Sequence, residues 1–172
     1  MKNVFVYRLD KLSSKQSEEY LDDLRIEKWH PGLARNIPPN SPFSYIYFWV
    51  MHYLKGFKNN EYCAYAIYNN QDIPISSLVC VPPLNNRWPF MKVGDLQIKN
   101  VYTFEDYRGM GYAFWLIHYA IKKQELNGRT YWYMTDEKNI PSQKLCEKIG
   151  FKYQGRYRHK RNKEIVPEGE IY

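Results

Sequence analysis

Hydrophobic positions along this chain follow two periods, and their alternation predicts a mixture of strands and helices. Short runs rich in β-branched and aromatic residues predict strands at residues 4–9, 62–68, 73–81, 96–104, 129–135, 151–158 and 164–171. Between them, helix signals lie at residues 14–28, 42–54, 111–124 and 140–149. The resulting order is β-α-α-β-β-β-α-β-α-β-β, which favours an α/β (α+β) domain.

Local signals define several helix ends. Ser13 and Gln16 have the spacing of a capping box before the first helix. Pro42 follows Ser41 at the start of the second helix, and Gly150 closes the last one. The helix at residues 111–124 carries one apolar stripe that belongs on a sheet, made of Ala113, Leu116, Ile117, Ala120 and Ile121.

Two aromatic segments each have two interpretations. The helix at residues 42–54 is apolar on most faces, so it is either deeply packed or partly exposed to a ligand or to a second subunit of a homodimer. Core packing is the favoured interpretation. The segment at residues 82–94 is too rich in proline for a strand, and it forms either a binding loop or a loop that tucks its aromatic residues onto the core.

The most informative turn lies between the strand at residues 96–104 and the next helix. The strand-helix-strand order predicts a parallel pair with a right-handed crossover, so this turn lies at the carboxyl end of the strand, where ligands bind. Gly109 and Gly111 leave room for a close approach to backbone N–H groups at a helix N-terminus, and Arg108 adds a positive charge. These features suit a pyrophosphate, although an ordinary strand-to-helix turn is the alternative.

Composition and net charge limit the kinds of molecule that this protein is expected to bind. The 172 residues with 44% hydrophobic content suit one domain over residues 1–172, and the formal charge of +7 favours an anionic partner. No apolar run approaches the roughly 20 residues of a membrane helix, and Arg8 comes too early for a secretory signal, so a cytoplasmic protein without membrane binding is expected. The three cysteines and four histidines are scattered, so neither a disulfide framework nor a metal site is expected.

Two segments in the second half of the chain carry recognisable motifs. Residues 101–113 read VYTFEDYRGMGYA, and residues 139–151 read NIPSQKLCEKIGF. The first is similar to the cofactor strand and the Arg/Gln-x-x-Gly-x-Gly/Ala loop of the GNAT superfamily of acetyl-CoA-dependent N-acyltransferases, and the second resembles its Asn-x-x-Ala/Ser…Leu-Tyr-Glu-Lys-x-Gly-Phe segment. Together they make the resemblance strong over nearly the whole chain. It implies the GNAT fold, a mixed twisted sheet of about six to seven strands with a central parallel pair and about four helices.

This resemblance implies acetyl-CoA as cofactor and a small-molecule primary amine as acceptor. The pyrophosphate would bind at the turn formed by Arg108, Gly109, Met110, Gly111, Tyr112 and Ala113. Val101 and Thr103, with Tyr102 between them, would offer main-chain hydrogen bonds to the pantetheine arm where the two parallel strands splay apart. Asn139 and Ser142 would face that arm from the other side, unless they serve only as an N-cap and a small packing residue.

Two positions depart from the family pattern. Gln97 stands where the family often has a Glu, and Cys146 stands where it often has a Tyr. Gln97 cannot act as a base, so the nearest candidate is Asp95 on the same strand face, unless that carboxylate is simply solvated. The Cys146 thiol could donate a proton, although its apolar helix face favours packing. Transfer can also proceed by positioning alone, with water relaying the protons.

The acceptor would lie across the splayed strands. It would be bounded by residues 32–40, the second helix and residues 82–94, where the aromatic side chains could stack on a sugar, a base or an apolar amine; these are Tyr45, Tyr47, Trp49, Trp88 and Phe90. The strand-turn signature also resembles bacterial GNATs that act on amino sugars. An acyl-CoA-binding domain without catalysis is one alternative. Nucleic-acid binding by the basic aromatic residues 153–161 is another, although a solvated hairpin beside the 3′-phosphate explains them better.

Overall fold

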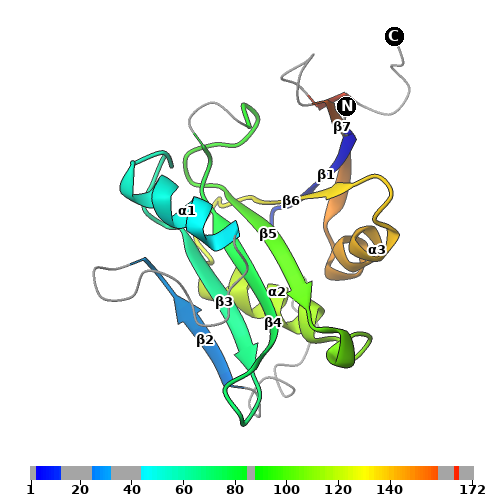
Figure 1. The fold of residues 1–172 in the computed structure, drawn as a ribbon. Coiled ribbons are helices and arrows are strands. Elements are labelled where there is room, and N and C mark those ends of the chain that lie inside the picture. Colours follow the sequence, from blue (N-terminus) through cyan, green and yellow to red (C-terminus); the bar gives the residue numbers. More distant parts are fainter. Residues whose placement is uncertain (1–2, 13–24, 32–43, 85–87, 159–164, 167–172) are drawn as a thin grey trace.

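The protein is built on one mixed β-sheet. The computed structural model describes residues 3–12, 25–31, 44–84, 88–158 and 165–166 (Figure 1). Its eight strands lie in the order β2-β3-β4-β5-β6-β1-β7-β8. The strands are β1 (Asn3–Leu9), β2 (Arg25–Trp29), β3 (Cys63–Tyr68), β4 (Pro74–Val81), β5 (Leu96–Thr103), β6 (Tyr131–Asp136), β7 (Lys152–Arg158) and β8 (Ile165–Val166). The helices are α1 (Ser44–Tyr53), α2 (Tyr112–Lys123) and α3 (Ile140–Ile149), with a short 3-10 turn, η2, at Glu105–Tyr107.

The sheet topology confirms the mixed fold that the sequence predicts. Strands β5 and β6 pair in parallel, and all other neighbouring strands are antiparallel. The sheet has eight strands where six to seven were expected, because β2, which the sequence analysis did not predict, adds to one edge. The described residues hold three α-helices, where the sequence predicted about four.

The prediction of the first helix is wrong over its last residues. The sequence predicted a helix over residues 14–28, yet Arg25–Trp29 is strand β2, which pairs antiparallel with β3. Its charged residues suit an edge strand, and pairing with the partner backbone outweighs local helix propensity there. Residues 13–24 lie outside the described part of the chain, as do most of the residues of the last predicted strand, 164–171.

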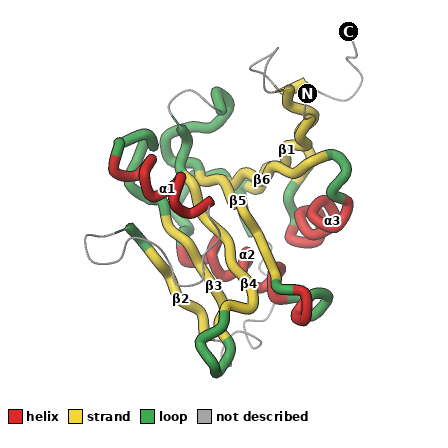
Figure 2. Tube along the Cα trace, viewed as in Figure 1, coloured by secondary structure: helices red, strands yellow, loops and turns green. Residues whose placement is uncertain are grey.

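The helices are divided between the two faces of the sheet (Figure 2). Helices α2 and α3 share one core with the sheet, in which Leu116 and Ile149 pack with Leu96 and Ile98 of β5. The opposite face is covered by α1, through Phe48, and by the loop around Trp88. The next side chains along β5, Gln97 and Lys99, therefore belong to the α1 face.

The structure shows how the two aromatic segments, at residues 42–54 and 82–94, pack against the sheet. Core packing is confirmed for the face of α1 that carries Phe48, whereas Tyr47 and Val50 are exposed on the helix. The loop tucks its aromatic residues onto the sheet, since Trp88 is buried against Tyr157. Its neighbour Phe90 packs against Trp132 in the same way.

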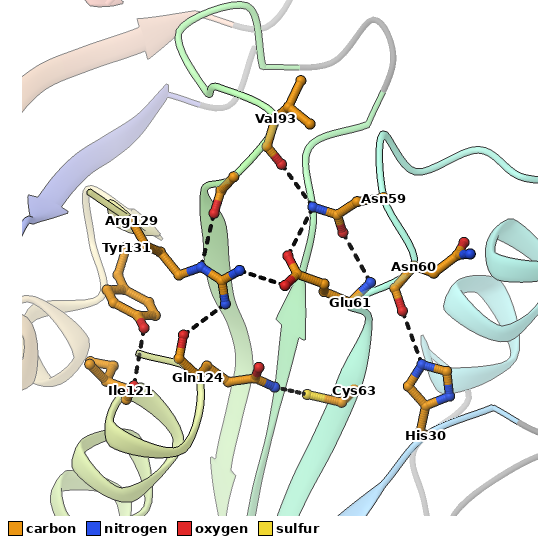
Figure 3. Close-up of polar contacts among 11 residues, drawn as sticks. His30, Asn59, Asn60, Glu61, Cys63, Val93, Ile121, Gln124, Arg129 and Tyr131 are labelled. Carbon is orange, nitrogen blue, oxygen red and sulfur yellow. Dashed lines mark hydrogen bonds and ion pairs between the residues drawn. The ribbon is translucent and has the colours of Figure 1, made fainter. Parts of the chain in front are cut away.

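A buried guanidinium fixes the amino ends of the parallel strands (Figure 3). Arg129 precedes β6 and has a side chain that is only 2% exposed. It donates to the carbonyl of Gly94 before β5 at 2.9 Å, to the carbonyl of Gln124 at the end of α2 at 2.7 Å, and to Glu61 Oε1 before β3 at 2.6 Å. One charge therefore holds four segments together, and Asn59 extends the network by donating to Glu61 and to the Val93 carbonyl.

Replacement of Arg129 tests this network. Arg129→Met should lower the free energy of unfolding by about 3 kcal/mol, because it leaves Glu61 and two carbonyls without their buried donor. Urea denaturation measures the change. Arg25→Met is the matched control: that guanidinium pairs with Asp72 at the surface and should cost less than about 1 kcal/mol. Equal losses in the two variants would contradict a special role for Arg129.

Candidate active site

The parallel strands separate part of the way along their length. Their pairing runs only from Leu96 with Tyr131 to Ile98 with Tyr133. Beyond this point β5 continues to Thr103, while β6 continues to Asp136 in register with β1. Figure 1 shows the two strands diverging. The splay that the sequence analysis expected is therefore present, and it opens at the carboxyl end of β5.

A bulge in β5 accompanies the splay. Lys99 pairs with Val79 and Tyr102 with Ser77, so Asn100 and Val101 lie opposite the single residue Leu78. Asn100 has a φ of 50°, a left-handed conformation that Asn tolerates better than most residues. Such an insertion bends the strand and increases its twist, which turns β5 away from β6. The sequence analysis missed Asn100, and its only local signal is a turn-type residue inside a strand.

The bulge also decides which main-chain groups face the splay. The Phe104 N–H donates to the Ile75 carbonyl on β4, so by alternation the main-chain groups of Val101 and Thr103 face the opposite edge. That edge borders the splay. The two residues expected to bond a pantetheine arm therefore present their backbone on the required side, although Arg108 Nε already donates to the Thr103 carbonyl at 3.1 Å.

The glycine turn has the geometry of an anion cradle. Gly109 and Gly111 have φ values of 81° and 85°, which side chains rarely adopt. The Trp115 N–H donates to the Gly111 carbonyl, so the N–H groups of the three preceding residues have no acceptor within α2. A Cβ on Gly109 would meet nothing within 4 Å, and one on Gly111 would meet only the Trp115 ring at 3.6 Å. The space above the turn is therefore open.

Charge beside this turn comes from Arg108. Its guanidinium is exposed, lies 5.8 Å from the centre of the Tyr102 ring and forms an ion pair of 3.2 Å with Glu105. Because Glu105 is also exposed, solvent weakens this pair and leaves the guanidinium available to an anion. Met110 is exposed on the same turn, and Tyr112 and Ala113 begin α2.

Helix α3 places two further predicted residues near the splay. Asn139 is the N-cap, and its side chain accepts from the Ser142 N–H at 3.2 Å, which confirms the capping interpretation. Ser142 Oγ shares a hydrogen bond of 2.9 Å with the Tyr133 hydroxyl. Burial raises the pKa of Tyr133, so this hydroxyl stays protonated at neutral pH. The sequence analysis did not select Tyr133, which ends the parallel pairing. Contact of Asn139 and Ser142 with a cofactor stays a prediction.

Cys146 lies inside the core. Its side chain is fully buried with Ile149, Phe151 and the inner face of the sheet. Burial, followed by the charge of Glu147, raises the pKa of the thiol well above its ordinary value. Such a thiol is neutral at physiological pH and is a weaker acid than a solvated one. These features favour packing over proton donation.

Asp95 and Gln97 lie toward the other end of β5. The Asp95 carboxylate is 3% exposed, and its Oδ2 accepts from the Lys92 N–H and from the Trp132 indole N–H, both at 2.8 Å. It is therefore bonded rather than simply solvated. Gln97 is buried and donates to Met134 Sδ at 3.5 Å. Asp95 is about 10 Å along the strand from the end of the parallel pairing, and the sheet separates its Trp132 contact from Cys146.

The region where the sequence analysis expected the acceptor is described in part. Tyr47 is exposed and Trp49 is half-buried on α1, and Lys99 Nζ lies 5.3 Å from the centre of the Phe48 ring. The side chain of Tyr45 and residues 32–40 lie outside the described residues.

The described residues were compared with the side-chain groupings that hold metal ions or cross membranes. Within the part of the chain that the structure describes, no three His, Cys, Asp or Glu residues are placed to hold a metal ion. In that same part, no helix has the length and apolar character needed to cross a bilayer.

Thiol reactivity tests the environment of Cys146. At pH 8 the raised pKa and the burial should make alkylation by iodoacetamide at least about a hundredfold slower in the folded protein than in guanidinium chloride. Peptide mass spectrometry reports the modification site by site. Rapid modification of Cys146 in the native protein would place the thiol at an accessible surface instead.

Comparison with known proteins agrees with this geometry. The family model "Acetyltransferase (GNAT) family" matches residues 16–151. No curated protein sequence matches the chain. Among solved structures, a GNAT-family protein from Novosphingobium aromaticivorans has a TM-score of 0.58 at 15% identity, covering 90% of this chain and 61% of that one. The chain thus spans less than two thirds of that protein's length.

Two enzymes whose structures are known are also similar. AAC(6')-Iy, in complex with the bisubstrate analogue CoA-S-monomethyl-acetylneamine, has a TM-score of 0.53 at 14% identity, covering 80% of this chain and 98% of that one. The ribosomal-protein-S18-alanine N-acetyltransferase from Escherichia coli has a TM-score of 0.50 at 14% identity, with 74% and 78% covered. These similarities show a shared fold. Because the family model covers most of the chain, this protein belongs to the GNAT acetyltransferase family.

Proposed function

We propose that this protein is an acetyl-CoA-dependent N-acetyltransferase that moves the acetyl group directly from the thioester to a primary amine of a small molecule. The observation that carries the proposal is the splay of β5 from β6 directly beside the glycine turn. An amino sugar is the favoured acceptor class, supported by the aromatic residues around the splay and by the resemblance of the strand-turn signature. The similar AAC(6')-Iy fold holds an analogue that contains CoA.

The residues at the turn suit this cofactor. The open space above Gly109, the N–H groups at the start of α2 and the exposed Arg108 fit a pyrophosphate. Val101 and Thr103 would hold the pantetheine arm through their main chain, and Asn139 and Ser142 would contact it from α3. When bound, acetyl-CoA supplies the activated acyl group.

The chain's own residues would act mainly by orienting the reactants. The acceptor amine must be a free base, and it must lie near the end of the parallel pairing, where the strands part. Gln97 would hydrogen-bond the acceptor or a water near this point. Cys146 and Asp95 stay the candidates for acid and base, yet the burial of the thiol and the two bonds to the carboxylate favour water as the proton relay.

A glycine substitution tests the cofactor site. Gly111→Asp should weaken acetyl-CoA binding more than about a hundredfold, because it places a side chain and a negative charge in the cradle. Isothermal titration calorimetry measures the affinity. Gly128→Asp is the matched control, since Gly128 also has a positive φ, of 77°, with open space around it, but it lies in the turn before β6. Unchanged affinity in the Gly111 variant would refute the site.

A second variant separates packing from catalysis at Cys146. If the thiol only packs, Cys146→Ala should keep kcat within about tenfold of the wild type while lowering stability. Steady-state kinetics with acetyl-CoA and an amine panel gives kcat, and calorimetry gives cofactor affinity. A loss of a hundredfold or more in kcat with unchanged acetyl-CoA affinity would instead identify Cys146 as the acid.

A non-catalytic acyl-CoA-binding domain is the second candidate function. It is favoured by the same two observations, the buried thiol at Cys146 and the fully engaged Oδ2 of Asp95. Tight acetyl-CoA binding without turnover across amino sugars, amino acids, polyamines and aminoglycosides would support it. Turnover of any of these amines would exclude it.

A further inference from the structure

Helix α1 is apolar on two sides, and the described chain covers only one of them. Phe48 is 2% exposed and packs against β3 and β4. At about 100° per residue, Val50 lies nearly opposite Phe48 around the helix. Leu54 continues the last turn, because its N–H donates to the Val50 carbonyl at 2.9 Å. We define the outer face of α1 as the apolar residues that surround Val50 and are 36% to 72% exposed: Ile46, Tyr47, Val50, Tyr53 and Leu54.

The outer face of α1 differs from an ordinary helix surface. A surface helix normally turns charged side chains toward water, whereas a helix that is apolar all round is normally buried. No Asp, Glu, Lys or Arg occurs from Ser44 to Leu54. In Figure 2, α1 lies at the outside of its layer, and no other described helix packs on it. The described part of the chain therefore leaves the outer face without a cover.

The exposed area is half of what a small symmetric interface needs. A fully exposed aromatic side chain presents about 150–250 Å², so the five partly exposed side chains together leave about 500 Å² on each copy. Pairing two such faces would remove about 1,000 Å² from water, which is the lower limit for a specific protein interface. The outer face is therefore large enough to pair with itself.

Charge favours a second copy over other occupants. The formal net charge of +7 makes two copies repel each other over most of their surfaces, and the uncharged outer face avoids this repulsion. A face that pairs with itself brings identical residues together at the two-fold axis, so its centre must be neutral. An anionic membrane or an acidic peptide would instead require Lys or Arg on the face, and the segment from Ser44 to Leu54 has neither.

We propose that the outer face of α1 binds the same face of a second copy of this chain, which makes the protein a homodimer. The two helices lie antiparallel, with Val50 at the two-fold axis, so the opposite ends of their dipoles lie side by side. The glycine turn stays free, because α1 and α2 cover opposite faces of the sheet. This assignment does not depend on the proposed transferase function.

Sedimentation velocity of the full chain tests the assignment. The wild type should sediment as a dimer, and Leu54→Arg should weaken dimerisation at least about tenfold, because it places a cation against the apolar face of the partner. Leu126→Arg is the matched control. Leu126 is also exposed, at 57%, but it lies between α2 and β6, so this variant should dimerise as the wild type does. Far-UV circular dichroism shows whether both variants are folded.

A cysteine at the expected axis tests the geometry. The three native cysteines are all buried, so Val50→Cys introduces a single exposed thiol. In a two-fold pair the two introduced thiols meet, and oxidation by copper phenanthroline should link them at least about tenfold faster than the thiols of Leu126→Cys. Non-reducing gel electrophoresis measures the linked dimer.

The dependence on salt separates the proposed dimer from a charge-driven contact. An apolar interface between two basic chains should strengthen as NaCl screens their repulsion. A wild type that stays monomeric at millimolar concentration, an undiminished dimer of Leu54→Arg, a dimer that salt weakens, or equal crosslinking at Val50 and Leu126 would each overturn the proposal. A monomer that binds phosphatidylserine vesicles, and loses this binding in Leu54→Arg, would also overturn it and would assign the face to a membrane surface.

Discussion

The end of the parallel pairing at Ile98 and Tyr133 is the constraint on which the site depends. A parallel sheet that continued to Thr103 would satisfy every main-chain group of β5 and leave nothing for a ligand to bind. The bulge at Asn100 accompanies the end of this pairing, because the inserted residue bends and twists β5 and changes which edge the following main-chain groups face. Both the opening and the orientation of its hydrogen-bonding groups follow from one extra residue.

Strands β5 and β6 separate at the carboxyl end of β5, so they need an anchor at their amino ends, where they are paired. Arg129 supplies it by joining the segments before β3, β5 and β6 to the end of α2. Desolvation offsets much of the attraction in a buried pair of this kind, but removing one partner is costly because it leaves the other buried group without compensation. The Arg129 network therefore lies at the amino ends of β5 and β6, and the glycine turn lies beyond the carboxyl end of β5, where the pair is open.

Cys146 and Tyr133 show how the departure from the family motif is accommodated. The small thiol fills a dry position on α3, while the Tyr133 ring projects from β6 into the same core and its hydroxyl bonds Ser142. Both groups are held protonated by burial. The described groups near the splay are therefore neutral hydrogen-bonding side chains and main chain, which favours the proposed transfer by orientation over transfer by a dedicated acid.

The sequence by itself determined the elements whose signals are local. The apolar stripe of α2, the Asn139 cap and Gly150 end of α3, and the paired glycines before α2 each depend on residues a few positions apart, and all were predicted correctly. Tertiary structure decided the rest, because it depends on partners distant in the chain. Pairing with β3 made Arg25–Trp29 a strand, the register against β4 placed the Asn100 bulge, and the Trp132 indole engaged Asp95. Local propensity is a small free energy, and long-range pairing and burial outweigh it wherever the two conflict.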